Sequence, residues 1–535
     1  MMNQWVIILI QILVPLGFGC IALLRGQDTS WDIQNYHLYN PYALLHHRLN
    51  FDLLPSGEET YYNPYIDLVY FLGIKYLAPC VLGFLIGFLQ GLNFVVLFHI
   101  YKSCLKAIDE KYARWAVLLA FLGIFSVGFL SEVGTVYWDS LVSLFPLISL
   151  LIIVKFMDSL VSGRGRALFT VVLAGMMAGI GGGLKLIAIP YAFSLFLSFF
   201  IISMPWKRKL IIAALFGGGA LFGFLSIDGL WLWNVWHLTG NPIFPRMNQI
   251  FHGELAPFTS ILDARFFPRN IIEGIFYPVV FTLNPFRVGE EAFRQISWLS
   301  VYLFSLVFLL SKAFQFFGMK KKSLMRSEIK YLLFFFWISF FLWMNIFGVY
   351  RYLIAIEILI PLILFVLLLN MLEVSFLTPA IVVVMIEFFT LFNINGIPDW
   401  GHSNWGAKVY RMENTWVQKE KIDLVLLMDK PLAWVVPALD IQAPFAQVVP
   451  GFSVNASYAN RVKSMISKVR QGKILVIFQP WVISLDKVND VLKAYNLVLT
   501  MNNCFVKKVY LGTEPFYFVF CLAQNPLPMP VHSLR

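Results

Sequence analysis

Charged residues are scarce in this chain: Asp, Glu, Lys and Arg make up 13% of its 535 residues, whereas hydrophobic residues make up 59%. A soluble domain typically carries about 25% charged residues. The mean hydropathy of +0.73 is also far from that of a soluble protein. Long unbroken apolar runs exclude a closed β-barrel, whose strands alternate between apolar and polar residues. The composition therefore predicts a polytopic α-helical membrane protein.

The common cofactor signatures are absent as well. The sequence contains no CxxC, HExxH, Walker A or Gly-rich strand-to-helix motif. The triplet Gly181-Gly182-Gly183 falls at the end of an apolar helix, which is typical of close helix packing rather than of a phosphate loop. No internal repeat indicates an inverted-topology transporter. We expect no metal, nucleotide or redox cofactor.

Cysteine is rare, with five residues in the chain. Cys20, Cys80 and Cys104 lie in or near apolar helices, and only Cys504 and Cys521 fall in the C-terminal tail. An oxidising compartment would permit a disulfide between these two if neighbouring strands carry them. Two unpaired small hydrophobic residues are the alternative, and the more common case.

The net charge of +11 is not concentrated in a basic stripe with interleaved aromatics, so we expect no nucleic-acid partner. Basic residues instead form short clusters between apolar runs. By the positive-inside rule, the loops that carry these clusters are cytoplasmic. The four clusters are Lys102 to Arg114, Lys155 to Arg166, Lys207 to Lys209, and Lys312 to Lys330.

With these loops inside, about eleven helices of ~20 residues cross the bilayer. The expected spans are 5–24, 79–101, 115–130, 138–155, 168–183, 187–204, 210–228, 298–316, 331–348, 353–371 and 376–392. The first lacks a basic n-region and a cleavage site, so we interpret it as a retained helix with a cytoplasmic N-terminus. The segment Ile66 to Tyr76 is too short to span and is expected at the membrane interface.

This threading predicts a membrane domain over 1–392, with a first outer loop at 25–78 and a long outer loop at 231–297. The tail, 393–535, has ordinary charge density and no spanning run. Its pattern predicts a strand at Lys473 to Gln479, a helix at Asp486 to Tyr495, and strands at Leu497 to Thr500 and Tyr517 to Leu522. We expect a soluble α/β domain on the outer side.

Asp32 is the outstanding candidate in the first outer loop. If Asp32 to Leu45 forms a helix on the membrane surface, Asp32 shares a face with Tyr36, and His37 is turned away. A carboxylate at a dry, aromatic-rich surface can accept a proton from an attacking hydroxyl. The alternative is a solvated helix cap.

Two isolated cations stand at outer helix ends. Lys185 in GGGLKLIAIPY and Arg351 in GVYRYLIAIEILIP have apolar neighbours on both sides. Such charges are costly near lipid unless they meet a partner or snorkel to water. Snorkelling explains either one alone. Both together, on the same side as Asp32, fit a bound anion such as a lipid phosphate. Glu357, inside a helix, also needs a buried partner or a proton.

These motifs, in this order, resemble those of the GT-C superfamily of integral-membrane glycosyltransferases, which use sugars carried on polyprenyl phosphate. Its members have an acidic residue in the first outer loop, a Gly-rich segment with a Lys similar to Gly183-Leu184-Lys185, and an Arg-Tyr pair similar to Arg351-Tyr352. The segment WHLTGNPIFPRMN, Trp236 to Asn248, also resembles one found in many bacterial members. The resemblance covers about residues 5–392.

The resemblance implies that Asp32 is a general base and that Lys185 and Arg351 hold the donor phosphate, with inversion at the anomeric carbon. Many members carry a second, adjacent acid, and here Glu132 and Asp139 are the candidates for it; a turn residue and a helix cap are the alternatives. Some relatives bind a divalent metal with such acids, but no ligand spacing here requires one. The further candidates for substrate binding are Tyr352, Tyr36, His37, His237 and Arg246.

The expected activity is transfer of a sugar from a polyprenyl-phosphate donor to a lipid, glycan or protein acceptor at the outer face of a bacterial inner membrane, with the C-terminal domain extracytoplasmic. Two alternatives are a flippase or transporter for a lipid-linked glycan and a glycan ligase or polymerase. The helix interiors are mostly Leu, Ile, Phe, Val, Ala and Gly. They lack the polar path that a flippase would need.

Overall fold

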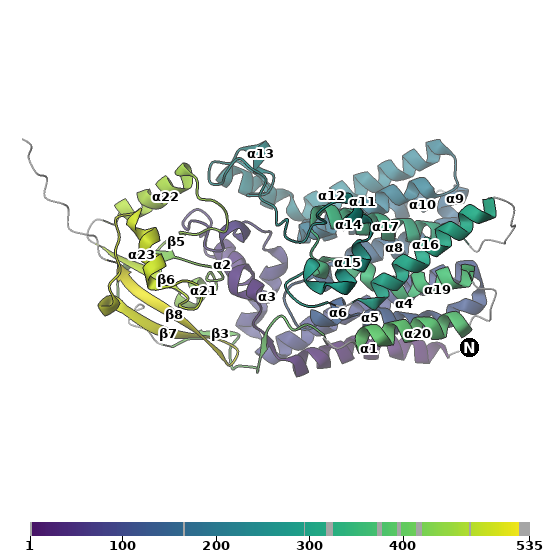
Figure 1. Cartoon of the computed structure of the whole chain (residues 1–535), viewed down its shortest axis with the longest axis horizontal. Coiled ribbons are helices and arrows are strands. Elements are labelled where there is room, and N and C mark those ends of the chain that lie inside the picture. The colour runs from purple at the N-terminus through teal and green to yellow at the C-terminus, as the bar shows by residue number, and fades with distance from the viewer. Residues whose placement is uncertain are drawn as a thin grey trace, which may run out of the picture. The chain divides into compact units, whose positions relative to one another are not determined.

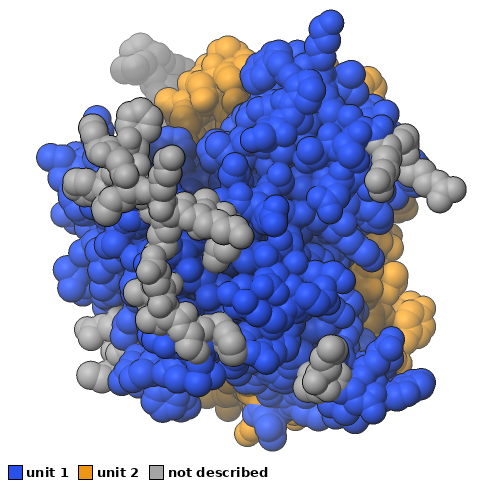
Figure 2. Space-filling model, turned by 90° about the vertical axis from the view of Figure 1, so that its right-hand side faces the viewer, with its two compact units in different colours: residues 1–24, 84–230, 263–399 blue, residues 25–83, 231–262, 400–535 orange. Residues whose placement is uncertain are grey.

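The computed structural model describes residues 3–163, 166–293, 295–316, 325–371, 377–392, 397–413, 420–469 and 472–523. Of the basic clusters, Arg164 and Lys320 to Lys322 lie outside these ranges. The chain is mostly helical and divides into two compact units. Unit 1 comprises residues 1–24, 84–230 and 263–399, and unit 2 comprises residues 25–83, 231–262 and 400–535 (Figure 2).

Long apolar helices identify a membrane protein. Five helices of the described ranges are long and apolar enough to cross a bilayer. They are α1 (Gln4–Arg25), α4 (Pro79–Ile108), α10 (Arg166–Leu184), α12 (Trp206–Thr239) and α17 (Ser327–Ile346) (Figure 1). A sixth candidate is a pair of segments, Tyr350–Glu357 and Ile360–Met371, bent by 54°. The count of about eleven spans stays a prediction.

Several expected spans are shorter or broken. The range 115–130 divides into α5 (Ala116–Ile124) and α6 (Val127–Ser131), because the backbone at Ser126 is extended. The range 138–155 divides into α7 (Asp139–Val142) and α8 (Leu144–Lys155). Three other expected spans correspond to shorter apolar helices: α11 (Ile189–Ser198), α16 (Ile296–Phe316) and α20 (Leu377–Leu391).

Glycine permits close packing between α10 and α12. A side chain added at Gly179 would collide with the backbone of Ala220, and one added at Gly223 would collide with that of Met176. Small residues spaced four apart commonly let membrane helices approach this closely. At Gly183, the end of the glycine triplet, an added Cβ would lie 2.9 Å from the Cβ of Ile227. The triplet therefore serves helix packing.

The bend between α18 (Ile354–Glu357) and α19 (Ile360–Met371) is held by hydrogen bonds that replace those lost at the break. Tyr101 donates its hydroxyl to the carbonyl of Ile358 at 2.6 Å. Glu357 accepts hydrogen bonds from the Tyr350 hydroxyl at 2.9 Å and the Gly128 amide at 3.1 Å. These are the buried partners that Glu357 requires, since an unsatisfied polar group in hydrocarbon costs several kcal/mol.

Unit 2 is built on a six-stranded mixed sheet in the order β3-β7-β8-β6-β4-β5. The strand β4 runs parallel to β5 and β6, and the other pairs are antiparallel. Their bounds are β3 (Tyr410–Met412), β4 (Ile422–Leu427), β5 (Phe445–Gln447), β6 (Lys473–Phe478), β7 (Cys504–Leu511) and β8 (Glu514–Ala523). Helices α22 (Ala456–Ser467) and α23 (Leu485–Lys493) lie beside the sheet (Figure 1).

The first loop belongs to this same unit. It forms a π-helix at Ile33–His37, followed by α2 (Tyr39–Leu45) and α3 (Tyr65–Tyr76). It also joins the sheet: the amide of Leu53 donates to the carbonyl of Phe445 at 2.7 Å, and Gln447 donates back to Leu53 at 2.9 Å. A second pairing joins β1 (Gln27–Asp28) to β2 (His402–Ser403). Residues far apart in sequence thus share one fold.

Most tail elements match the predicted pattern. The expected strands at 473–479 and 517–522 correspond to β6 and β8, and the expected helix at 486–495 corresponds to α23, with Val488 and Leu492 buried. The strand expected at 497–500 is wrong. Its apolar residues enter the core as a loop instead, held where Asn489 accepts from the Leu499 amide at 2.8 Å and donates to its carbonyl at 3.2 Å.

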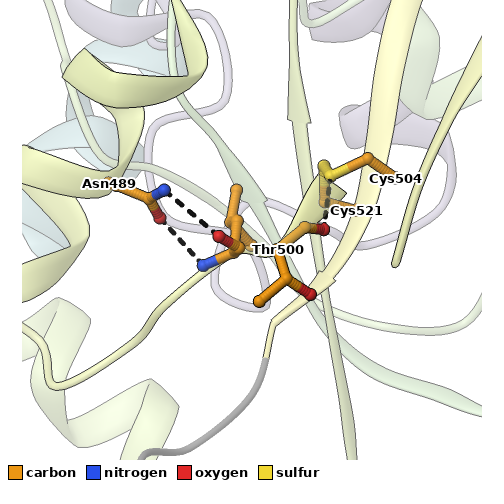
Figure 3. Close-up of a disulfide and its surroundings, with 5 residues drawn as sticks. Asn489, Thr500, Cys504 and Cys521 are labelled. Atoms are coloured by element: carbon orange, nitrogen blue, oxygen red, sulfur yellow. Dashed lines mark hydrogen bonds between the residues drawn. A yellow bond between two sulfur atoms is a disulfide. The ribbon is translucent and has the colours of Figure 1, made fainter. Parts of the chain in front are cut away.

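Cys504 and Cys521 form a disulfide. They face each other on the antiparallel strands β7 and β8, with their Cα atoms 4.1 Å apart (Figure 3). The sequence allowed this bond without favouring it, because the spacing alone does not pair the strands. Cys20, Cys80 and Cys104 are free.

Candidate functional site

Asp139 is the centre of an ion cluster in unit 1. It opens α7, directly after the turn that follows α6, and its side chain is 1% exposed. Lys185, just beyond the end of α10, forms an ion pair with Asp139 Oδ1 and donates to the carbonyl of Tyr137 at 2.7 Å. Arg351 places its Nε 3.7 Å from Asp139 Oδ2. Two cations from distant parts of the sequence therefore share one carboxylate.

Aromatic rings hold both cations in place. The guanidinium carbon of Arg351 lies 4.0 Å from the centre of the Tyr137 ring and 5.1 Å from that of Tyr352. Lys185 Nζ lies 5.7 Å from the centre of the Tyr352 ring. Tyr191, on α11, donates its hydroxyl to the carbonyl of Tyr352. Cation–π contacts of this kind stabilise a charge without neutralising it, so the cations keep their ability to bind an anion.

The backbone beside Asp139 is strained. Trp138 has φ = 66° and ψ = −3°, a left-handed conformation that is a genuine outlier for a bulky residue. Such conformations cost about 1–3 kcal/mol and cluster at functional sites. Here the turn directs Tyr137 toward Arg351 while Asp139 faces Lys185. The strain marks this turn as a site with a geometric requirement beyond packing.

Glu132 completes the cluster as a buried acid. It is fully buried and accepts a hydrogen bond from the Ser140 amide at 2.9 Å. Burial raises the pKa of Glu132 well above its usual value, and the nearby Asp139 carboxylate raises it further, with Arg351 and Lys185 acting in the opposite direction. Two cations thus approach Asp139, with the buried carboxyl group of Glu132 beside it.

The cavity at this cluster is small. It has a volume of about 10 Å³, with Asp139, Arg351, Tyr352 and Tyr191 among its lining residues. That volume is about the minimum for a single water molecule. The Lys185 and Arg351 side chains remain 17% and 13% exposed. An incoming anion would therefore bind at the exposed side of the two cations rather than inside the cavity.

Asp32 lies in a second cluster, within unit 2. It is 6% exposed and accepts a hydrogen bond from the Tyr36 hydroxyl at 2.9 Å. Its side chain makes no hydrogen bond to the backbone of the helix that it precedes, so it does not act as a cap. His37 Nδ1 lies 2.6 Å from Asp67 Oδ1, and the ring of His37 packs on that of Tyr36 at 4.1 Å. The result is a buried Asp–Tyr and His–Asp array.

Arg246 is tied to a network of acids in the same unit. It donates to the Tyr62 hydroxyl at 3.0 Å and lies 3.4 Å from Glu58. Lys430 lies 2.6 Å from the neighbouring Glu59. Burial raises the pKa of Glu59 to about 7, with Lys430 opposing that rise and Glu58 adding to it. Arg246 also donates to the carbonyl of Ile261 at 2.6 Å, so it fastens its loop to the unit.

His237 lies apart from both clusters. It is exposed on α12 and packs against Trp233, with ring centres 4.3 Å apart. Trp233 and Trp236 are 53% and 50% exposed. Exposed Trp residues at the end of a long apolar helix are typical of a membrane interface. The structure thus gathers Glu132, Asp139, Lys185, Arg351 and Tyr352 in one cluster and Asp32, Tyr36 and His37 in another.

Sequence reasoning missed three contributors. Tyr137 lies next to the predicted acid Asp139, and its ring position depends on the strained turn. Asp67 is the partner of His37, in the same loop. Tyr191 follows Lys185 by about two helical turns. Proximity in sequence could have indicated Tyr137, whereas Asp67 lies 30 residues from His37 and carried no such signal. Over the described ranges, no group of three or more His, Cys, Asp or Glu residues could hold a metal ion.

No family model matches this sequence, and no curated protein matches it either.

Proposed function

We propose that this protein is an integral-membrane glycosyltransferase of GT-C type that transfers a sugar from a polyprenyl-phosphate donor to an acceptor at the outer face of the membrane. The observation that carries the proposal is the ion cluster at Asp139. Lys185 and Arg351, singled out from sequence as isolated cations, meet at one carboxylate. Two cations brought together in this way supply the positive charge that binding of a phosphate requires.

The proposed reaction needs opposite polarities on the two sides of the anomeric carbon. An acceptor hydroxyl attacks that carbon, and the bond from the carbon to the donor phosphate oxygen breaks. A carboxylate base takes the hydroxyl proton, the role for which the sequence nominates Asp32, and polyprenyl phosphate leaves as an anion. Lys185 and Arg351 stabilise the charge that collects on the leaving phosphate. Attack from the face opposite the phosphate inverts the configuration.

The orientation that we propose has about eleven spans, a cytoplasmic N-terminus and unit 2 outside. The basic residues Arg166 and Lys330 belong to the first turns of α10 and α17, whereas Lys185 and Arg351 follow the other ends of these helices. The positive-inside rule then assigns the ion cluster to the outer side. The disulfide in unit 2 supports the same side, since disulfides persist in oxidising compartments.

The test uses purified protein in detergent with a labelled polyprenyl-phosphate sugar and candidate acceptors. We expect Asp32→Asn to abolish transfer while donor binding and expression are retained, because only the proton acceptor is lost. Asp490→Asn, at an exposed residue of α23, is the matched control. Lys185→Ala or Arg351→Ala should weaken donor binding. Normal activity in Asp32→Asn protein would contradict the assignment of the base.

The same assay separates the alternatives. A transferase consumes donor in detergent, where no sealed compartment exists. A flippase acts only across sealed vesicles and leaves the donor chemically unchanged. A ligase or polymerase requires a polymeric donor and ignores the polyprenyl-phosphate monosaccharide.

A further inference from the structure

Unit 2 contains a large polar cavity on residues that the proposed chemistry does not use. Its volume is about 1500 Å³, larger than the ~300–1,000 Å³ of typical small-molecule sites. The lining residues fall within 49–61, 238–255 and 421–473, so the first loop, the second long loop and the tail all contribute. The cavity lies wholly within unit 2.

One wall of this cavity is the polar face of α22. The opposite face of the helix enters the hydrophobic core through Tyr458, Val462 and Ile466. An amphipathic helix anchored in this way presents its other face in a fixed orientation. The polar residues of α22 and its end that line the cavity are Ser457, Asn460, Arg461, Ser464 and Lys468, and the apolar Met465 and Val469 line it beside them. The wall is therefore preformed.

Positive charge is in excess along the lining. Among the described residues, Lys421, Arg461 and Lys468 form no ion pair. Of the lining carboxylates, Asp52 is paired with Arg48 at 2.8 Å, Asp423 accepts a hydrogen bond from the Lys473 amide at 3.0 Å, and Glu254 is exposed. In the described part of the chain, these three cations outnumber the two lining carboxylates outside any ion pair, Asp423 and Glu254, and the excess positive charge favours a ligand that carries negative charge.

The rest of the lining suits carbohydrate. Sugar hydroxyls both donate and accept hydrogen bonds, and the amide of Asn460 and the hydroxyls of Ser457 and Ser464 offer both functions. Phe51, at the same cavity, is 45% exposed, and an exposed ring provides an apolar surface for the C–H face of a sugar.

We propose that this cavity binds an anionic oligosaccharide, which is the acceptor of the transfer reaction. The role of this ligand as the acceptor rests on the proposed function. The binding of an anionic oligosaccharide in the cavity does not. Either carboxylated or phosphorylated sugars supply the required charge. A cavity of this size accommodates several sugar residues, so the ligand is a chain rather than a monosaccharide.

The experiment measures binding by calorimetry to the full-length protein in detergent. The probes are hexagalacturonate, a phosphorylated oligomannose, and neutral maltohexaose as the matched control. We expect at least one acidic oligosaccharide to bind at least tenfold more tightly than maltohexaose, which corresponds to about 1.4 kcal/mol. The preferred probe identifies the anionic group. Equal affinity for the neutral chain, or no binding of either acidic chain, would overturn the proposal.

Variants test the location. Arg461→Ala combined with Lys468→Ala should weaken binding of the acidic chain at least tenfold, and Lys421→Gln, on a different segment, should weaken it separately. Lys463→Ala is the control, since Lys463 is exposed on α22 but does not line the cavity. Unchanged binding in both lining variants overturns the assignment.

Binding and transfer can fail independently. Asp32→Asn protein should keep full affinity for the acidic oligosaccharide, because Asp32 does not line the cavity. If this affinity is present and transfer is absent from the wild-type protein, the proposed function fails alone. If transfer occurs but no acidic chain binds, the cavity proposal fails alone.

Discussion

Replacing Asp139 with Asn should destabilise the protein in a way that a lipid phosphate repairs. The substitution removes the carboxylate that both Lys185 and Arg351 approach. Breaking a fully buried pair costs about 3–5 kcal/mol because the remaining charge is uncompensated. Since the two cations are 17% and 13% exposed, water screens part of that cost. We expect a loss of about 2–3 kcal/mol.

The assay is thermal unfolding in detergent with and without polyprenyl phosphate. The Asp139→Asn protein should show a lower Tm by a few degrees, and polyprenyl phosphate should restore most of the loss. At a concentration about 100 times Kd, a ligand that binds only the folded state adds about 2.7 kcal/mol. The wild-type protein should gain less, because its Asp139 carboxylate repels the incoming phosphate.

Two controls make this result specific. Polyprenol without phosphate should not restore Tm, and Asp158→Asn, at an exposed residue of α9 (Met157–Ser162), should leave Tm unchanged. If polyprenyl phosphate has no greater effect on Asp139→Asn than on the wild-type protein, the cluster is a structural ion pair and the reasoning is refuted.

Three further outcomes are expected. Arg351→Lys keeps the charge but loses the planar group on the Tyr137 ring, so the KM for donor should rise about tenfold with a smaller change in kcat; an unchanged KM would argue against donor contact. Burial raises the pKa of Asp429 from 3.8 to about 7. The folded state then retains a proton that the unfolded state loses, and stability should fall between about pH 4 and 7 by up to about 4 kcal/mol. Tm measured from pH 4 to 8 should flatten in Asp429→Asn protein, and an identical profile in both proteins contradicts this. Replacing Cys504 and Cys521 by Ser should lower the free energy of unfolding by about 3 kcal/mol, as expected for a closed loop of ~15 residues. Equal Tm values of the wild-type protein with and without reductant would contradict this.

The sequence predicted the local elements of unit 2 well. Alternation and amphipathic spacing identified β6, β8 and α23, because each buries one face and exposes the other. It failed at 497–500, where Leu497 and Leu499 enter the core and the range holds one isolated β-bridge, at Val498, in place of a strand. An apolar run predicts that a segment is buried, but burial alone does not determine whether the segment is a strand or a loop.

The association of distant segments was beyond the sequence pattern. Outer loops were predicted at 25–78 and 231–297, and the structure assigns residues 25–83 and 231–262 to the same compact unit as residues 400–535. The contacts responsible are backbone hydrogen bonds such as that between Leu53 and Phe445, which carry no residue-type signal. Pairing of Cys504 with Cys521 is of the same kind, since it follows from the register of β7 and β8.

The placement of charged residues was the most informative signal for the site, because the free-energy cost of a charge near lipid constrains where such a residue can stand. A lone cation at the end of an apolar helix is costly, so its presence requires a partner that the neighbouring residues do not supply. That argument selected Lys185 and Arg351 before any geometry was known, and both have Asp139 as that partner. The same argument could not select Tyr137, because a tyrosine side chain near a membrane surface has no comparable free-energy cost. Energetic reasoning therefore finds the charged members of a site, and only the strained turn at Trp138 shows how the neutral members are oriented toward them.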